Sequence, residues 1–277
     1  AIYTSNEGTA NRSTFKSVLN YPPSAAFGFY QPTKIVCGPR SIANLSNELR
    51  QLGARRAVVI TDRGVRAAGI VDEVQRAGGD RIAGVFDGVV PDPTYECADA
   101  ALDYCRAVGA DAIVSLGGGS SIDAAKLTLV ALSNGGSAIE NMGLLRLDRP
   151  LLPHVAIPTT HGTGSEVTLG AVITNAQLHR KFFVADFHLI PKVAILDPTL
   201  VTGLPKPVTI GTGLDALTHA IEGLVTPAAN PITTATGLQS VRLIAEHLPR
   251  VVADGNDLES RQGMLVAATL AGITLGP

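Results

Sequence analysis

The chain has 277 residues, with 24 acidic and 22 basic side chains and a formal net charge of −2. Hydrophobic residues make up 45% and charged residues 17%, which supplies a sizeable core and argues against intrinsic disorder. The near-neutral charge, the 4% aromatic content and the absence of Trp exclude a polycationic or base-stacking nucleic-acid-binding protein and a basic membrane-binding surface.

The three cysteines, Cys37, Cys97 and Cys105, form no C-x-x-C pair and cannot all be paired. A disulfide framework is therefore excluded, and a reducing, cytoplasmic compartment is expected. No apolar run reaches the roughly 18 residues that a membrane span requires. Residues 1–16 lack the charged and apolar segments of a secretory signal, so we expect neither secretion nor a membrane partner.

Residues 1–26 are rich in Ser, Thr and Asn without a hydrophobic period, and are expected to form a polar N-terminal extension. An edge strand is expected near Phe27–Tyr30. Beyond it, short β-branched runs alternate with segments of helical period, which predicts βαβ crossovers and a mostly parallel sheet with helices on both faces. The expected strands are 34–37, 57–61, 82–86, 112–116 and 155–157, and the expected helices are 40–52, 64–77, 94–108 and 120–133.

The pattern changes after about residue 170. Two short apolar runs predict a hairpin, a third predicts a last strand, and only helical periods follow from Pro207 onward. We therefore expect an α/β domain of residues 27–198 and a helical domain of residues 199–277. The expected hairpin strands are 171–174 and 182–184 around a turn at 175–180, the last strand is 193–196, and the helices are 207–225, 231–253 and 257–275.

A glycine-rich turn follows the expected strand at 112–116, where Gly117, Gly118 and Gly119 lead into Ser120 and a helix. Glycines allow close approach of the backbone to a phosphate, and the free N–H groups of a helix N-terminus favour a diphosphate. Ser120 can cap the helix or donate to a phosphate oxygen. The turn is neither G-x-G-x-x-G nor a P-loop, so a tight turn without a ligand stays open as the alternative.

Two further loops follow expected strands. Asp62 ends one strand, where a carboxylate can bond to both hydroxyls of an adenosine ribose and repel a 2′-phosphate, or can simply cap the next helix. These two roles are compatible. Residues 158–168 are dense in hydroxyl side chains and glycines, and can line a polar cleft or begin a capped helix. Within them, His161 is either a hydrogen-bonding or a catalytic residue.

Asp215 and His219 are four residues apart in an expected helix, so both side chains lie on one face. A carboxylate and an imidazole there can bind one divalent metal such as Fe²⁺, Zn²⁺, Mn²⁺ or Co²⁺. A usable site needs about four ligands. The alternative is an Asp–His hydrogen bond within the helix.

Several segments share one order and spacing with a known family: 86–94, 117–123, 158–160, 162–168, 180–182, 197–198 and 215–222. Together they resemble the iron-containing (group III) alcohol dehydrogenase family, and the likeness covers residues 28–277. The resemblance implies an α/β fold: a Rossmann-like N-terminal domain with a mostly parallel sheet that binds NAD(P), followed by an all-helical C-terminal domain that carries the metal.

The resemblance also assigns residues to the cofactor and the metal. It places Asp62 on the adenosine ribose, which favours NAD over NADP because a carboxylate repels a 2′-phosphate. It places Gly118, Gly119 and Ser120 at the diphosphate, and Asp123, Thr159, Thr160, Thr163 and Lys181 around the nicotinamide ribose and ring. Asp215 and His219 match the first two of the family's four ligands for Fe²⁺ or Zn²⁺.

The chain departs from the family pattern at two places. The other two metal ligands of the family are histidines beyond the segment that resembles 267–272, and family members are longer. The resemblance therefore implies an incomplete helical domain, a C-terminally truncated chain and a metal site with two of its four ligands. At position 161, commonly small in the family, this chain has His161.

The resemblance implies an NAD-dependent, metal-assisted oxidoreductase that interconverts a small primary alcohol and its aldehyde, as a homodimer formed through the N-terminal strand. The metal would act as a Lewis acid on the substrate oxygen. Two alternatives stay open. One is a catalytically silent nucleotide-binding fragment or pseudoenzyme, since two ligands hold a metal weakly. The other is a related enzyme on the same scaffold, glycerol dehydrogenase-like or sugar-phosphate-cyclising.

Overall fold

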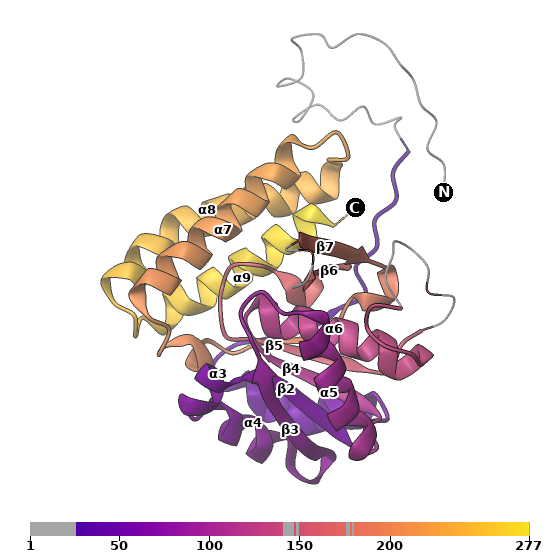
Figure 1. Cartoon of the computed structure of the whole chain (residues 1–277). Coiled ribbons are helices and arrows are strands. Elements are labelled where there is room, and N and C mark those ends of the chain that lie inside the picture. The colour runs from indigo at the N-terminus through magenta and orange to yellow at the C-terminus, as the bar shows by residue number, and fades with distance from the viewer. Residues whose placement is uncertain (1–25, 141–146, 148–149, 176–177, 179, 277) are drawn as a thin grey trace.

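A computed structural model describes residues 26–140, 147, 150–175, 178 and 180–276. At its centre lies a six-stranded sheet in which all neighbouring strands are parallel (Figure 1). From edge to edge the order is β1-β8-β5-β4-β2-β3. The strands are β1 (Lys34–Cys37), β2 (Ala57–Asp62), β3 (Ile82–Val89), β4 (Ala112–Gly117), β5 (His154–Pro158) and β8 (Val193–Leu196).

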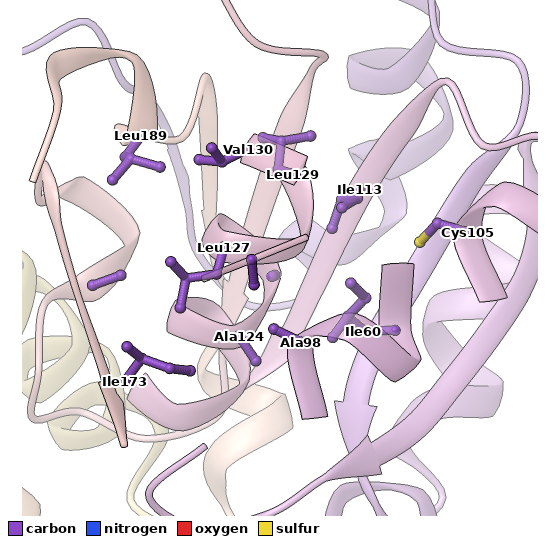
Figure 2. Close-up of a cluster of buried hydrophobic side chains, with 14 of the residues drawn as sticks. Ile60, Ala98, Cys105, Ile113, Ala124, Leu127, Leu129, Val130, Ile173 and Leu189 are labelled. Atoms are coloured by element: carbon purple, nitrogen blue, oxygen red, sulfur yellow. The ribbon is translucent and has the colours of Figure 1, made fainter. Parts of the chain in front are cut away.

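Helices cover both faces of the sheet because successive strand residues point to opposite sides. Ile60 and Ile113 pack against α5 and α6 on one face (Figure 2). Their neighbours Val59 and Val114 pack against α2 and α4 on the other. This explains why the central strands have nearly continuous apolar sequences. The helices are α2 (Leu45–Gln51), α4 (Ile70–Gly78), α5 (Tyr95–Ala107) and α6 (Gly119–Asn134).

The strand order reverses direction between β2 and β4. From β2 the chain goes outward to β3 at one edge, whereas from β4 it continues inward to β5 and then β8. Connections that leave two neighbouring strands in opposite directions open a crevice at the carboxyl ends of those strands. Asp62 and the glycine-rich turn, which end β2 and β4, therefore lie side by side at this crevice.

A two-stranded antiparallel hairpin, β6 (Gly170–Asn175) with β7 (Arg180–Ala185), stands apart from the main sheet. Its buried residues, including Ala171 and Ile173, join the core around α6. The alternate residues Val172 and Phe183 are exposed and form a register pair on the opposite side. The hairpin thus presents one side to the core and the other to the crevice.

The last part of the chain forms three helices, α7 (Lys206–Val225), α8 (Pro231–Ala253) and α9 (Leu258–Leu275), which pack on one another (Figure 1). Small residues such as Ala216 and Ala268 allow this close packing. Asn230 begins α8 with a reciprocal capping box that includes Thr233. Leu265 of α9 contacts the β8 cluster, which joins the helical layer to the sheet.

The α/β fold class and the order of elements predicted from the sequence are confirmed. The parallel strands, the antiparallel hairpin and the three final helices lie within a few residues of their predicted bounds. Among the helices of the described part of the chain, none is both long and apolar enough to cross a membrane.

Two predicted helices were wrong in detail. The segment 64–77 is two helices, α3 (Arg63–Ala67) and α4, because Gly69 takes a left-handed conformation, with φ of 78°, between them. The expected helix at 40–52 begins with a 3₁₀ turn over Ser41–Asn44 before α2. Helical periodicity continues through both interruptions, so the sequence pattern did not reveal them.

The expected edge strand at Phe27–Tyr30, through which a homodimer was expected, does not form: these residues adopt no regular secondary structure. Side chains just beyond it bond to loops instead, as Gln31 Nε2 donates to the Val167 carbonyl at 2.9 Å and Thr33 Oγ1 to that of Pro191 at 2.7 Å. The predicted extension up to residue 25, and part of the hairpin turn at 175–180, lie outside the described residues.

Candidate active site

A cavity of about 2120 Å³ lies at the carboxyl ends of β2 and β4, between the sheet, the hairpin and α7. This volume is larger than that of a typical small-molecule site. Every residue that the sequence assigned to cofactor or metal lines this one cavity. They are Asp62, Gly118, Gly119, Ser120, Asp123, Thr159, Thr160, Thr163, Lys181, Asp215 and His219.

The glycine-rich turn is closely packed and leaves little room for side chains. A Cβ at Gly119 would lie 2.6 Å from Thr163 Cγ2, and one at Gly118 would lie 3.2 Å from Thr160 Cγ2. Gly117 has a φ of 146°, which L-residues rarely adopt. Because α6 begins at Gly119 and is 16 residues long, its first amides and its positive dipole end face the cavity. The turn is therefore suited to bind a diphosphate.

Asp62 lies beside this turn. Its Oδ1 caps α3 by accepting the Val65 N–H at 2.9 Å, and its Oδ2 lies 3.4 Å from Ser121 Oγ. The predicted capping role is confirmed, and Oδ2 remains close to the cavity that Asp62 lines. One carboxylate can thus hold the helix with one oxygen and accept from a ligand hydroxyl with the other.

Asp123, one turn into α6, is held by two donors from the opposite wall. Its Oδ1 accepts from Ser165 Oγ at 2.5 Å, and its Oδ2 accepts the Val172 N–H at 2.9 Å. The pKa of this carboxyl is raised, because burial outweighs the opposing effects of the nearby Lys126 charge and of these two hydrogen bonds. The carboxylate is therefore a fixed acceptor whose remaining lone pairs can serve a ligand.

Lys181 lies at the rim of the cavity and pairs with Asp92, with 2.6 Å between Nζ and Oδ1. Both side chains are more than half exposed, at 59% and 66%, so the pair contributes at most about 1 kcal/mol to stability. A ligand in the cavity could therefore displace Asp92 from Lys181 at little cost.

Asp215 and His219 meet on one face of α7, with 3.6 Å between Oδ1 and Nε2. Two ligands about 2.1 Å from a tetrahedral ion are separated by roughly 3.4 Å, so the pair fits two positions of a divalent metal site. The Nδ1 atom of His219 is buried and has no hydrogen-bond partner. The described residues contain no group of three or more His, Cys, Asp or Glu side chains arranged to hold an ion.

Comparison with known proteins agrees with this arrangement. Residues 32–198 match the family model of iron-containing alcohol dehydrogenases, and residues 209–277 match that of the family's C-terminal part. The chain belongs to the iron-containing alcohol dehydrogenase family. The resemblance inferred from the sequence motifs is thereby confirmed.

Two characterised relatives of this family member are each 39% identical to it. The NAD-dependent methanol dehydrogenase of Bacillus methanolicus aligns over 248 residues, which cover 88% of this chain and 65% of that protein. The 1,3-propanediol dehydrogenase of Citrobacter freundii aligns over 253 residues, 89% of this chain and 65% of that protein. The chain thus spans about two thirds of the length of these relatives.

Solved structures of the family have the same fold. The crystal structure of a 1,3-propanediol oxidoreductase superimposes with a TM-score of 0.87 at 37% identity, over 90% of this chain and 66% of that one. A sulfoacetaldehyde reductase from Bifidobacterium kashiwanohense, solved in complex with NAD⁺, superimposes with a TM-score of 0.85 at 28% identity, over 91% and 67%.

Sequence reasoning assigned no role to Lys126 and left that of His161 open. Lys126 is fully buried beneath the cavity, although it lies in an otherwise apolar stretch of α6, and that interruption was the available signal. His161 is also buried, and its Nε2 accepts from Arg261 Nη1 at 3.3 Å. Burial, and then the charge of Arg261, lower the pKa of His161 to about 4. This neutral acceptor ties the loop after β5 to α9.

Proposed function

We propose that this protein is an NAD-dependent, metal-assisted oxidoreductase that interconverts a small primary alcohol and its aldehyde. The observation that carries the proposal is that one cavity joins the glycine-rich turn of α6 to the Asp215–His219 pair of α7. Support comes from relatives named methanol and 1,3-propanediol dehydrogenases, and from the structural neighbour in complex with NAD⁺.

In this proposal the cofactor lies across the switch point of the sheet. The amides of Gly119 and Ser120 bind the diphosphate, and Asp62 accepts from the hydroxyls of the adenosine ribose. Asp123, the Thr159–Thr163 loop and Lys181 surround the nicotinamide ribose and ring. The assignment keeps residues 27–198 as the NAD-binding domain and residues 199–277 as the metal-binding domain.

Asp215 and His219 hold Fe²⁺ or Zn²⁺ in this proposal, because a carboxylate oxygen and an imidazole nitrogen suit either ion. When bound, the ion supplies Lewis acidity to the substrate oxygen. The chain's own residues orient the nicotinamide so that its ring faces this end of the cavity. Bound NAD⁺ would supply the hydride acceptor, so that alcohol and NAD⁺ would give aldehyde, NADH and a proton.

A cytoplasmic location is part of the proposal. Its support is that Cys37, Cys97 and Cys105 are all free thiols in the folded chain. Burial raises the pKa of the Cys105 thiol to about 12, which makes this core cysteine unreactive.

The choice of NAD over NADP tests the cofactor assignment. Asp62→Ser keeps an N-cap oxygen for α3 but removes the carboxylate, so folding should be nearly unaffected. We expect the ratio of NADPH to NADH affinity to rise by about tenfold, since about 1.4 kcal/mol of repulsion is removed. Fluorescence titration with both cofactors measures this ratio. An unchanged ratio would argue that the adenosine ribose lies away from Asp62.

Turnover tests the reaction. Protein supplied with Fe²⁺ or Zn²⁺ is expected to form NADH from short primary alcohols, as followed by absorbance. His219→Ala should reduce this rate by roughly 100-fold or more, because even loss of a residue behind a metal ligand costs about 10–100-fold. Thr218→Ala, an exposed change on the same helix, is the matched control and should leave the rate unchanged.

The second candidate is a nucleotide-binding protein without turnover, favoured by the two metal ligands that the described residues supply. NADH binding by calorimetry, together with no NADH formation from any alcohol with either metal, would support this candidate and contradict the oxidoreductase. Tight one-to-one metal binding would contradict this second candidate.

A further inference from the structure

Lys126 lies behind the cavity wall and contacts the loop that forms it. The side chain is fully buried and its residue does not line the cavity. Its three N–H groups are shared among four oxygens: Ser165 Oγ at 3.1 Å, the carbonyl and hydroxyl oxygens of Thr168 at 2.9 and 3.2 Å, and the Gly170 carbonyl at 2.6 Å. All three of these partners line the cavity. One ammonium group thus holds residues 165–170 against α6.

The direction of these hydrogen bonds follows from their chemistry. An ammonium group can only donate, so Ser165 Oγ accepts from Lys126. The hydroxyl hydrogen of Ser165 is then left for Asp123 Oδ1, 2.5 Å away. Since the backbone N–H of Val172 occupies Asp123 Oδ2, the orientation of this carboxylate is determined by residues that Lys126 holds in place.

Charge reinforces this geometry. Burial lowers the pKa of Lys126 to about 8, and the carboxylates of Asp123 and Glu166 oppose this shift. Glu166 is on the 3₁₀ turn Ser165–Val167, and its own carboxylate accepts from Thr269 Oγ1 at 2.7 Å. His154 of β5 also faces the ammonium group, whose charge contributes to its lowered pKa. Lys126 is the cation among these buried groups.

We propose that Lys126 is a positioning residue for the cofactor: acting through Ser165, it holds the Asp123 carboxylate as an oriented hydrogen-bond acceptor in the nucleotide cavity. The inference rests on the proposed function, because it takes the ligand of that cavity to be NAD. In this role Lys126 touches neither cofactor nor substrate and acts only through its neighbours.

NADH affinity as a function of pH tests the inference. Lys126→Met keeps the volume but removes the charge, so Asp123 is left buried without its cation and its pKa rises further. We expect NADH binding about tenfold weaker than in the wild type at pH 7, where Lys126 is charged, and weaker still as the pH falls to 6. Lys192→Met is the matched control. Lys192 directly precedes β8, at the amino end of the strand and away from the cavity, so this variant should bind NADH as the wild type does.

A double-mutant cycle decides whether Lys126 acts through Asp123. Lys126→Met/Asp123→Asn should bind NADH no more weakly than Asp123→Asn alone, without the pH dependence. Additive losses, or a wild-type pH profile in Lys126→Met, would overturn the inference, because a merely structural role predicts them. Should Lys126→Met not fold, Ser165→Ala decides: binding about threefold or more weaker supports the inference, and unchanged binding overturns it.

Urea unfolding of the same variants needs no cofactor and separates the two proposals. Without Lys126 the pKa of Asp123 in the folded state rises further, so Lys126→Met should lose stability relative to the wild type as the pH rises from 5 to 7, below the range in which Lys126 titrates. Asp123→Asn in the same background should remove this difference. If wild-type protein binds no NADH, the proposed function fails, whereas absence of this coupling refutes the role of Lys126.

Discussion

Replacement of Arg261 by methionine is expected to lower the free energy of unfolding by about 3 kcal/mol, because it leaves two buried and three partly buried acceptors without a donor. Arg261 is only 1% exposed, and its guanidinium joins segments that are far apart in the sequence. It donates to Gly255 O at 2.8 Å, Thr209 Oγ1 at 3.0 Å, and Thr202 O, Leu204 O and His161 Nε2 at 3.3 Å each.

Arg250→Met is the matched control for this change. Arg250 of α8 pairs with Asp257 and Glu259, but its side chain is 44% exposed. Solvent-exposed ion pairs contribute only about 0–1 kcal/mol, so this variant should remain close to the wild type. Urea denaturation curves give both free energies. If Arg261→Met is no less stable than Arg250→Met, the hydrogen bonds around Arg261 do not carry the energy assigned to them.

The position of Arg261 also links stability to the candidate site. Thr209, which accepts from the guanidinium, lies in the first turn of α7, and Asp215 and His219 follow on the same helix. His161 belongs to the loop whose threonines pack against the glycine-rich turn. Arg261 therefore holds α7, which carries the candidate metal ligands, and the loop after β5 in one arrangement.

The sequence was sufficient to predict features that depend on neighbouring residues. The glycine-rich turn, the cap at Asp62 and the Asp215–His219 pair each depend on residues within four positions of one another. Helix and strand geometry fixes such neighbours directly. The parallel sheet followed from apolar runs that are buried on both faces.

The features that were missed depend on distant pairs. Lys126 and Ser165 are 39 residues apart, and His161 and Arg261 are 100 residues apart. A single sequence does not indicate which polar residues meet across such distances. In the sequence, Lys126 within its apolar helix and Arg261 near the start of α9 are equally compatible with solvent exposure. The fold brings them into the interior, where each finds its partners.

Acidification is expected to destabilise the protein, with His154 making the largest single contribution. This residue begins β5, is 2% exposed, and has Nε2 within 2.8 Å of Ser115 Oγ and a buried Nδ1 without a partner. Burial, and then the charge of Lys126, lower its pKa to about 3. In the unfolded chain the imidazole returns to a pKa of about 6.5.

Between these two values the unfolded state binds a proton that the folded state does not, so stability falls as the pH falls below about 6.5. By pH 4.5 the loss amounts to about 3 kcal/mol from this one group. His161, whose pKa is also lowered, adds in the same direction. Asp123 and Glu166 oppose it, because their raised pKa values make the folded state the better proton acceptor.

His154→Gln isolates the contribution of this imidazole, since glutamine can still bond to Ser115 but does not titrate. Urea unfolding at pH 7.5 and 4.5 should show the wild type losing about 3 kcal/mol more than the variant over this interval. Ser115→Ala removes the hydrogen bond but leaves the imidazole, and should follow the wild-type profile. If the wild type and His154→Gln lose the same free energy of unfolding between pH 7.5 and 4.5, His154 must be able to take up a proton in the folded protein. The unpaired Nδ1 would then have found a partner, because a buried imidazolium without one could not persist there.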